Sequence, residues 1–522
     1  MNFCENTKIR QDNSLWLGDM SQQYLKFQNV TFIYDSASEP LFQNVSLHVA
    51  CGWSGVVGPN GAGKTTLLKL ATGLLEPNAG SITACRSSVY CPQRTDDIPE
   101  RLSELIFTNT KSAVVIKSRL GVCDDWAERW TTLSHGERKR AQIAVALWLR
   151  PDVLAIDEPT NHIDSQACEI IAQALCSFKG VGLIVSHNRE LLDLLCQQCL
   201  FLDPPGVIAR PGGVTRGMEI AKAERQSLEK QYVQRKRAYK ALQREAVRRG
   251  ELAKQSQKMR SKRGLAKKDH DAREKKDRAR VSGKDGVGGK IQRQLKGRLA
   301  QTRKNMESIT VKKQHTLGIW LPGSVSKRNF LLELSAGSLS LGGQKQLFYP
   351  ELQINPDDRI AVTGPNGSGK STLIRFIVDS LNVPKKYVTY VPQEIDLGHS
   401  KGILAQALAL PKDKLGHLMT IVSRLGSRPE KLLNSDEPSP GETRKLLLAI
   451  GMTCTPHIII MDEPTNHMDL PSIECLEQAL KDCPCSLLLV SHDRYFLSEL
   501  TSRQWNITLD MNSIGRYVLS KL

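Results

Sequence analysis

Two glycine-rich segments have the residue types and the spacing of phosphate-binding loops. They are Gly58-x4-Gly63-Lys64-Thr65 and Gly364-x4-Gly369-Lys370-Ser371. Glycines let the backbone N–H groups of such a loop close around phosphate groups, at the positive end of the following helix. The lysine of each loop would reach the β and γ phosphates of a nucleotide, and the hydroxyl after it would be a ligand of Mg²⁺. One match can arise by chance, but two matches, each between an expected strand and an expected helix, predict two ATP sites. The loop residues expected to line them are Gly58, Pro59, Asn60, Gly61, Ala62, Gly63, Lys64, Thr65, Thr66, Gly364, Pro365, Asn366, Gly367, Ser368, Gly369, Lys370, Ser371 and Thr372.

Two apolar stretches, 153–158 and 458–463, read as buried strands that end in an adjacent Asp and Glu. The aspartates, Asp157 and Asp462, would hold the Mg²⁺ shell, and the glutamates would polarise the water that attacks the γ phosphate. A Ser-His-Asn/Asp-Arg segment follows each strand, and its histidine would lie near the γ phosphate. Either histidine alone could equally be an ordinary loop residue, but the recurrence favours a role in the site. The expected catalytic residues are Glu158, Glu463, His187 and His492.

Two smaller elements also recur. A Pro-Gln pair follows a strand in each half, and its glutamine would touch the metal or the water, although each could be a polar loop residue. A serine-glycine-glutamate motif precedes a helix in each half, and a serine with backbone amides at a helix start suits a second contact with a γ phosphate. These residues are Gln93, Ser134, Gly136 and Glu137 in the first half and Gln393, Ser439, Gly441 and Glu442 in the second. The expected metal ligands are Thr65, Gln93, Asp157, Ser371, Gln393 and Asp462.

The spacing of these landmarks indicates a duplicated domain. Lys64 and Lys370 lie 306 residues apart, whereas Asp157 and Asp462 lie 305 apart. Gly136 and His187 each have a counterpart 305 residues later. One offset kept across the whole unit predicts two copies of a domain. We expect an N-terminal segment over 1–24, a first domain over 25–213, a linker over 214–327 and a second domain over 328–522.

The linker carries the positive charge of the chain. Residues 216–313 contain 32 Lys and Arg against 11 Asp and Glu, a net charge of +21, whereas the whole chain has +18. The remainder therefore sums to −3. Phosphate-rich polymers are the usual partners of such a segment, although a solvated helical surface would also carry charge.

Apolar residues in the linker predict two long helices. Leu228, Tyr232, Tyr239, Leu242 and Ala246 form one seam, and Ile291, Leu295, Leu299, Met306 and Ile309 form a second. Between the seams, Gly264, Gly283, Gly286, Gly288 and Gly289 are expected to break any helix. We therefore expect an antiparallel hairpin with a basic tip at about 258–290. The tip has no Phe, Tyr or Trp, which favours contacts with the phosphates and shape of RNA over base stacking. The residues expected to bind RNA are Lys258, Arg260, Lys262, Arg263, Lys267, Lys268, Arg273, Lys275 and Lys276.

Together these elements resemble the ATP-binding-cassette ATPases, and within them the F subfamily. The twin cassettes, the charged linker and the repeated Glu-Pro-Thr-Asn-His-Ile/Met-Asp segments at 158–164 and 463–469 carry the resemblance. It implies an α/β fold of two P-loop ATP-binding-cassette domains joined by a long antiparallel α-helical hairpin linker. It also implies hydrolysis of ATP with Mg²⁺, and cassettes that pair head to tail within one monomer. Lys64 would then share its ATP with Ser439 and Gly441, and Lys370 would share its ATP with Ser134 and Gly136.

The resemblance further implies action on the ribosome, with the linker reaching the large-subunit RNA and the P-site tRNA near the peptidyl-transferase centre. Some members of the family regulate translation, and others protect ribosomes against antibiotics. The long tip, and the short interval between Gln93 and Ser134, favour ribosome protection here. A housekeeping translation regulator is the alternative. A cytoplasmic subunit of a membrane transporter is a weaker alternative, because such a subunit needs no basic hairpin. A DNA-binding ATPase, which the charge of the linker permits, is also a weaker alternative.

The sequence departs from the family pattern at three places. His135 stands where the first signature usually has Gly, and the second signature has Pro438 and Pro440. Because Pro440 cannot donate a backbone hydrogen bond, we expect the ATP site built on Lys64 to be the weaker one. Tyr34 is the candidate for an aromatic ring that stacks on adenine in the first copy, and the segment around Leu341 offers no equivalent.

Composition sets the broad class. Hydrophobic residues make up 40% of the 522, enough for packed cores, but no apolar run reaches the roughly 18 residues that span a bilayer. The first residues do not have the pattern of a signal peptide. The 13 cysteines are scattered, which is typical of reduced thiols in a cytoplasm. Cys196 and Cys199 form a CxxC pair without a second pair of ligands, so core cysteines at a helix end are a better interpretation than a metal site.

Overall fold

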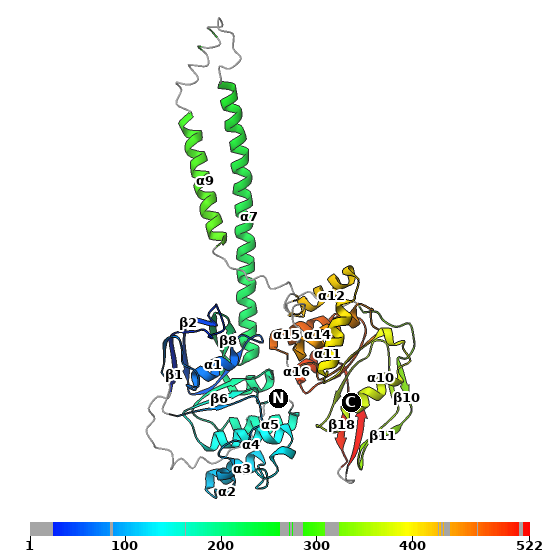
Figure 1. Cartoon of the computed structure of the whole chain (residues 1–522). Coiled ribbons are helices and arrows are strands. Elements are labelled where there is room, and N and C mark those ends of the chain that lie inside the picture. Colours follow the sequence, from blue (N-terminus) through cyan, green and yellow to red (C-terminus); the bar gives the residue numbers. More distant parts are fainter. Residues whose placement is uncertain are drawn as a thin grey trace, which may run out of the picture. The chain divides into compact units, whose positions relative to one another are not determined.

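The structure is a computed structural model of the whole chain (Figure 1). It describes residues 24–83, 87–161, 163–260, 285–307, 323–425, 439–466, 468–510 and 515–521, with a few isolated positions between these ranges. The chain divides into two compact units. One contains residues 1–217 and 315–522, and the other contains residues 218–314. The domain boundaries expected at residues 213 and 327 remain predictions.

The first cassette is built on a six-stranded sheet in the order β5-β6-β7-β3-β8-β9. Neighbours from β5 to β8 pair in parallel, and β9 pairs antiparallel with β8. The strands are β3 (Gly52–Val57), β5 (Ser88–Cys91), β6 (Val153–Asp157), β7 (Val181–Val185), β8 (Cys196–Asp203) and β9 (Gly206–Pro211). Every residue of β6 and β7 is buried, as expected for central parallel strands covered on both faces. A separate antiparallel sheet contains β1 (Tyr24–Phe32), β2 (Phe42–Ala50) and β4 (Ala79–Thr83).

The helices of this cassette connect the strands. The phosphate-loop helix α1 spans Lys64–Ala71, and a helical region is formed by α2 (Leu102–Phe107), α3 (Lys111–Leu120), η1 (Trp130–Thr132) and α4 (His135–Trp148). Two more helices, α5 (Ser165–Leu175) and α6 (Arg189–Leu195), follow β6 and β7. The helix predicted after Gly63 is confirmed. The carboxyl ends of β3 and β6 therefore lie at one edge of the sheet.

The second cassette repeats this order. Its eight-stranded sheet runs β11-β12-β19-β18-β14-β17-β16-β15, so its last six strands match the six of the first cassette. The strands are β11 (Gly337–Gly342), β12 (Lys345–Tyr349), β14 (Arg359–Thr363), β15 (Val388–Val391), β16 (Ile458–Asp462), β17 (Ser486–Val490), β18 (Arg503–Leu509) and β19 (Arg516–Lys521). Here β12 pairs in parallel with β19, which joins the β11–β12 hairpin to the main sheet. A short ladder joins β10 (Leu332–Leu334) to β13 (Leu352–Ile354).

Its α-helices also correspond to those of the first cassette, and η2 (Lys385–Tyr387) is an additional short helix before β15. The α-helices are α10 (Lys370–Ser380), α11 (Leu397–Leu408), α12 (Lys412–Arg424), α14 (Pro440–Met452), α15 (Leu470–Lys481) and α16 (Arg494–Leu500). The duplication predicted from spacing, and the α/β class, are confirmed by the matching strand orders.

The linker forms the predicted pair of helices, α7 (Val214–Arg260) and α9 (Asp285–Glu307), which lie side by side and antiparallel (Figure 1). Arg235 of α7 donates a hydrogen bond to the backbone oxygen of Asn305 in α9 (2.5 Å). Leu295 is buried, and Tyr232 and Leu242 are half-buried, as expected for a seam between two helices. Leu228, however, is 43% exposed, so the first seam begins later than predicted.

The prediction that the linker glycines break the helix was partly wrong. Gly286, Gly288 and Gly289 were expected to break the helix, but they lie in the first turns of α9. Glycine weakens a helix by only about 1 kcal/mol per residue, so a long helix tolerates several. Gly264, Gly283 and Ile309 lie outside the described residues, and so do Lys262, Arg263, Lys267, Lys268, Arg273, Lys275 and Lys276 of the expected RNA contacts. Lys258 and Arg260 lie in the last turn of α7.

Within the described ranges, no helix combines the length and the apolarity needed to cross a bilayer. Cys196 and Cys199 are buried at the start of β8, directly after α6, as core cysteines. No cluster of three His, Cys, Asp or Glu side chains suited to a metal occurs among the residues that the structure describes.

Candidate functional site

The two phosphate loops have the same conformation. Gly63 (φ 89°) and Gly369 (φ 91°) cap α1 and α10 in the left-handed region, where a side chain would be strained. A Cβ atom at Gly369 would also lie only 2.5 Å from Leu341. Each lysine folds back over its own loop, because Lys64 Nζ donates to the Gly58 oxygen (2.9 Å) and Lys370 Nζ donates to the Gly364 oxygen (2.8 Å). The two ammonium groups therefore lie where phosphate groups would be held.

The first carboxylate of each strand end meets the hydroxyl after the loop lysine. The Thr65 hydroxyl donates to Asp157 Oδ2 (2.7 Å), which also accepts from the Tyr90 hydroxyl (3.2 Å). In the second copy the Ser371 hydroxyl lies 3.4 Å from Gln393 Oε1 and also bonds to Asp462, whose Oδ1 atom is buried without a hydrogen-bond partner. Hydroxyl, carboxylate and amide oxygens are the ligands that Mg²⁺ prefers, so these residues fit that ion. Sequence reasoning missed Tyr90.

The second carboxylates, Glu158 and Glu463, are almost fully buried, with 5% and 3% of their surface exposed. Both have a positive φ, 45° and 49°, which is strained for a residue with a side chain. Burial raises the pKa of Glu158 to about 7 and that of Glu463 to about 8, and the nearby Lys64 and Lys370 oppose this rise. Each carboxyl therefore has a pKa near neutral pH, the range that suits a general base.

The predicted histidines meet the glutamates. His187 Nε2 lies 3.0 Å from Glu158 Oε1, and His492 Nε2 lies 3.4 Å from Glu463 Oε1. Burial, and then Lys370, lower the pKa of His492 to about 4, so this ring is neutral at pH 7 and its contact with Glu463 is not an ion pair. His492 Nε2 also lies 3.1 Å from the Asn366 side-chain oxygen in the phosphate loop. Loop, glutamate and histidine therefore form one cluster in the second copy.

The two signature motifs begin helices. Ser134 caps α4 and Ser439 caps α14, and each forms a capping box with the glutamate three residues later. Pro440 is the first residue of α14, where a missing N–H leaves no helical hydrogen bond unmade. Pro438 lies outside the described residues. Both helix starts keep the positive end of the dipole available to an anion.

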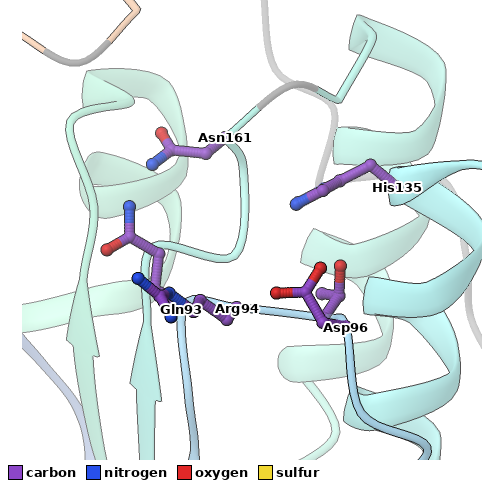
Figure 2. A pocket seen from close by; sticks show the side chains of 6 residues that line it. Gln93, Arg94, Asp96, His135 and Asn161 are labelled. Atoms are coloured by element: carbon purple, nitrogen blue, oxygen red, sulfur yellow. The ribbon is translucent and has the colours of Figure 1, made fainter. Parts of the chain in front are cut away.

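His135, the departure in the first signature, opens α4 and lines a cavity of its own cassette. The cavity has a volume of about 260 Å³ and is lined by Gln93, Arg94, Thr95, Asp96, His135 and Asn161. Figure 2 shows His135 reaching toward Gln93 and Asn161 from the opposite wall. The Pro-Gln segment, the signature helix and the segment after Glu158 therefore meet at this cavity.

Each phosphate loop is contacted by an aspartate of the other cassette. The Asn60 N–H donates to Asp469 Oδ2 (2.7 Å), and the Asn366 N–H donates to Asp164 Oδ2 (3.4 Å). The loop around Lys370 also shares a cavity of about 380 Å³ with Ile163 of the first cassette. These contacts place each loop next to the other copy, as head-to-tail pairing requires. Sequence reasoning did not select Asp164 or Asp469, although both end the repeated segments that it noted.

Two arginines link the cassettes away from the loops. Arg189, at the start of α6, forms an ion pair with Glu477 of α15 (3.0 Å), and both side chains are largely buried. The equivalent Arg494 pairs with Glu169 (2.9 Å), but both of these side chains are more than half exposed. The two sides of the paired cassettes therefore differ in how they are held.

A buried cation lies beside each pair of carboxylates and donates hydrogen bonds to the backbone around them. Lys139 of α4 is fully buried, and its ammonium donates to the backbone oxygens of Pro92 (2.6 Å) and Asp157 (3.2 Å). Arg444 of α14 is its equivalent and donates to backbone oxygens of Gln393 and Asn466. Both cations connect the signature helix to the Pro-Gln segment. The signal that could have found them is a basic residue five positions after the signature serine in both copies.

Tyr34 lies beside the first phosphate loop. Its hydroxyl is 2.7 Å from the Thr66 hydroxyl, and 44% of its surface is exposed. In the second cassette the aliphatic Leu341 occupies the neighbourhood of Gly369 and lines the cavity of the loop. The ring of Tyr34 is therefore available to a base at the first loop, whereas Leu341 has the place beside Gly369 that Leu41 has beside Gly63 in the first cassette.

The comparisons with known proteins agree with this geometry. The protein family described as ABC transporter matches residues 42–161 and 349–466. The ribosome protection protein VmlR of Bacillus subtilis is 26% identical over 90% of this chain and 84% of its own length. The energy-dependent translational throttle protein EttA of Mycobacterium tuberculosis is 26% identical over 85% of this chain and 84% of its own. Among solved structures, the RNase-L inhibitor has the same fold, with a TM-score of 0.58, 19% identity and coverage of 94% and 90% of the two chains.

Proposed function

The chain belongs to the ABC-F subfamily of the ATP-binding-cassette ATPases, and on that premise we propose that it is a ribosome-binding ATPase whose basic linker contacts the tRNA region. Its two cassettes bind and hydrolyse ATP. The observation that supports the ribosome as partner is the charge of residues 216–313, +21 in a chain whose remainder is near neutral. The relatives named for ribosome protection and for control of translation support it as well.

The site residues have distinct roles in the proposed reaction. The loop amides, with Lys64 and Lys370, bind the phosphates, and the capped starts of α4 and α14 contact the γ phosphate held by the opposite loop. Glu158 and Glu463 accept a proton from the attacking water, and His187 and His492 orient the γ phosphate. Thr65, Asp157 and Gln93, with Ser371, Asp462 and Gln393, hold Mg²⁺, which neutralises charge on the phosphates when bound.

Binding of ATP brings the cassettes together, and hydrolysis lets them separate. Because α7 leaves the first cassette and the chain after α9 enters the second, closure of the cassettes reorients the linker hairpin. The closed state places the linker near the peptidyl-transferase centre, and hydrolysis releases the protein. While the closed state is bound, the linker tip protects the ribosome against large-subunit antibiotics by displacing tRNA or reshaping the RNA.

The Glu158→Gln/Glu463→Gln double variant tests the ATPase cycle. It keeps ATP binding but removes the two proton acceptors, so we expect it to sediment with ribosomes in the presence of ATP. The Glu104→Gln/Glu499→Gln variant is a matched control, because both of these glutamates are exposed. Release of the double variant at the rate of the control would refute the proposed cycle.

Protection and regulation are separated by a panel of large-subunit antibiotics. Cells that express the whole chain should survive at higher drug concentrations than cells that express a chain lacking residues 258–290. If the two strains are equally sensitive to every drug while the whole chain still binds ribosomes, the housekeeping translation regulator becomes the better account. Co-sedimentation with membranes in place of ribosomes would favour a transporter subunit.

A further inference from the structure

A second cationic surface lies on the second cassette, at the edge opposite the phosphate loop. It is formed where β15 and β16 begin, at Val388 and Ile458, whereas Asp462 ends β16 at the other edge. Two aromatic rings mark its centre. Tyr387 and His457 stack with ring centroids 4.4 Å apart and planes 5° apart, and the Lys386 ammonium lies 4.7 Å from the Tyr387 ring. The stack is half-buried, so it is fixed in place and still reachable from solvent.

Basic side chains surround this stack. Lys327, Arg328, Lys385 and Lys386 are all exposed. Arg328 donates a hydrogen bond to the backbone oxygen of Asn382, which fixes its guanidinium beside the stack. Burial, and then the charge of Arg328, lower the pKa of His457, so its ring is neutral at pH 7 and can accept or donate a hydrogen bond.

Among the described residues, the first cassette has no such surface at the same place. Asp152 precedes β6 as His457 precedes β16, and Ser87 precedes β5 as Tyr387 precedes β15. Asp152 accepts hydrogen bonds from the N–H (3.0 Å) and the hydroxyl (3.1 Å) of Ser87. A hydrogen-bonded aspartate and serine therefore stand where the second cassette has the stack of Tyr387 and His457. The fold does not require the stack, because the other copy forms the same strands without it.

The surface adjoins the end of the basic linker. The Ser324 N–H donates to the Pro456 oxygen (3.1 Å), one residue before His457, so the chain that returns from the linker enters the cassette beside the stack. We propose that Arg328, Lys385, Lys386, Tyr387 and His457 form a second RNA-binding surface, which contacts the phosphate backbone of the RNA that the linker enters. The proposal rests on the proposed function and adds a contact to it.

RNA explains the composition of the surface better than an acidic protein does. Exposed lysines and an arginine neutralise successive phosphates, and a planar ring stack with a neutral imidazole suits riboses and base edges. Every basic residue of the surface is exposed, so each can reach a phosphate from solvent. A ribosomal protein is therefore the competing partner, and the experiment separates the two.

The test measures ribosome binding by the full chain over a range of salt concentrations. The Arg328→Gln/Lys385→Gln/Lys386→Gln variant loses three phosphate contacts, so its slope of log affinity against log salt should fall by about 2 to 3. We expect affinity near physiological salt to fall about tenfold or more. The Lys401→Gln/Lys412→Gln/Lys414→Gln variant removes the same charge from α11 and α12 of the same cassette and should bind like the unmodified chain. Basal ATP hydrolysis should be the same in all three proteins.

A second measurement identifies the partner. Photo-crosslinking from position 387 should label RNA, and the His457→Asp variant, which copies the first cassette, should lose that crosslink. Equal affinities and slopes for the two triple variants, or labelling of ribosomal protein only, would overturn the proposal. If the unmodified chain fails to bind ribosomes, the proposed function fails. The surface is then judged on purified large-subunit RNA, where equal binding by the two triple variants refutes it.

Discussion

The Asp469 carboxylate of the second cassette accepts a hydrogen bond from the backbone N–H of Asn60, in the phosphate loop of the first (2.7 Å). The other oxygen of Asp469 accepts from the Ser472 N–H (2.9 Å) and so caps α15. Burial alone would raise the pKa of Asp469, but hydrogen bonds with the Ser472 side chain and the N–H groups of Asn60 and Ser472, together with the charge of Lys445, hold that pKa below its ordinary value. One side chain thus connects a helix start in one cassette to the ATP site of the other.

Asp469→Asn should separate these two roles. Asparagine caps helices as well as aspartate does, so the free energy of unfolding should change little. The bond to Asn60 loses its charge, which is worth about 1.5 kcal/mol, so ATP hydrolysis should fall roughly tenfold. Asp164→Asn is the matched control, because its bond to Asn366 is longer (3.4 Å), and it should have a smaller effect. Equal losses of activity in the two variants would contradict this prediction.

The ion pairs between the cassettes should also differ. Glu477→Gln removes the ion-pair partner of the buried Arg189, which costs about 3 kcal/mol, whereas Glu169→Gln removes an exposed pair worth less than about 1 kcal/mol. Urea denaturation of the ligand-free chain measures both changes. We expect the free energy of unfolding to fall clearly for Glu477→Gln and hardly at all for Glu169→Gln. The reverse order would show that Arg189 and Glu477 do not hold the cassettes together.

The stability of the chain should fall when the charge of Lys139 is removed, but it should change little when arginine replaces Lys139. Lys139→Met leaves the backbone oxygens of Pro92 and Asp157 without their donor, so the unfolding free energy should fall by about 2 to 4 kcal/mol. Lys139→Arg copies the residue of the second cassette and should keep most of the stability. Thermal and urea unfolding of the two variants measure this. Similar losses of unfolding free energy in both variants would show that the charge at position 139 does not stabilise the fold.

Stability should depend on pH through the two buried glutamates. Their pKa values are about 7 and 8 in the folded chain but near 4.5 in the unfolded chain, so the folded chain retains protons that the unfolded chain has released. The stability from these protons is complete below pH 4.5 and is lost as the pH rises through 7 and 8. Unfolding followed in a chelating buffer from pH 5 to 9 should therefore show a decline that the Glu158→Gln/Glu463→Gln variant lacks. Parallel pH profiles for the two proteins would contradict it.

The phosphate loops and the carboxylate strands could be predicted from the sequence because each is specified by contiguous residues. A glycine-rich turn between a strand and a helix has one common conformation, and a fully apolar strand must be buried. The repeat could be predicted because both copies kept the same spacing.

Contacts between distant segments could not be predicted in the same way. Asn60 and Asp469 are 409 residues apart, and no local pattern indicates that a helix cap also faces a loop of the other copy. Lys139 looks like any basic residue on a helix until the packing of α4 shows it to be fully buried. The glycines of α9 led to an error for the opposite reason, because a local preference of about 1 kcal/mol was overridden by a long helix.

The left-handed backbone at Glu158 and Glu463 has a consequence for how the chain can change. Glycine adopts this conformation without the strain of about 1 kcal/mol that a side chain incurs, and it would also remove a carboxyl from a buried place. Both copies nonetheless have glutamate at this position, which fits a requirement of the proposed reaction and not of stability.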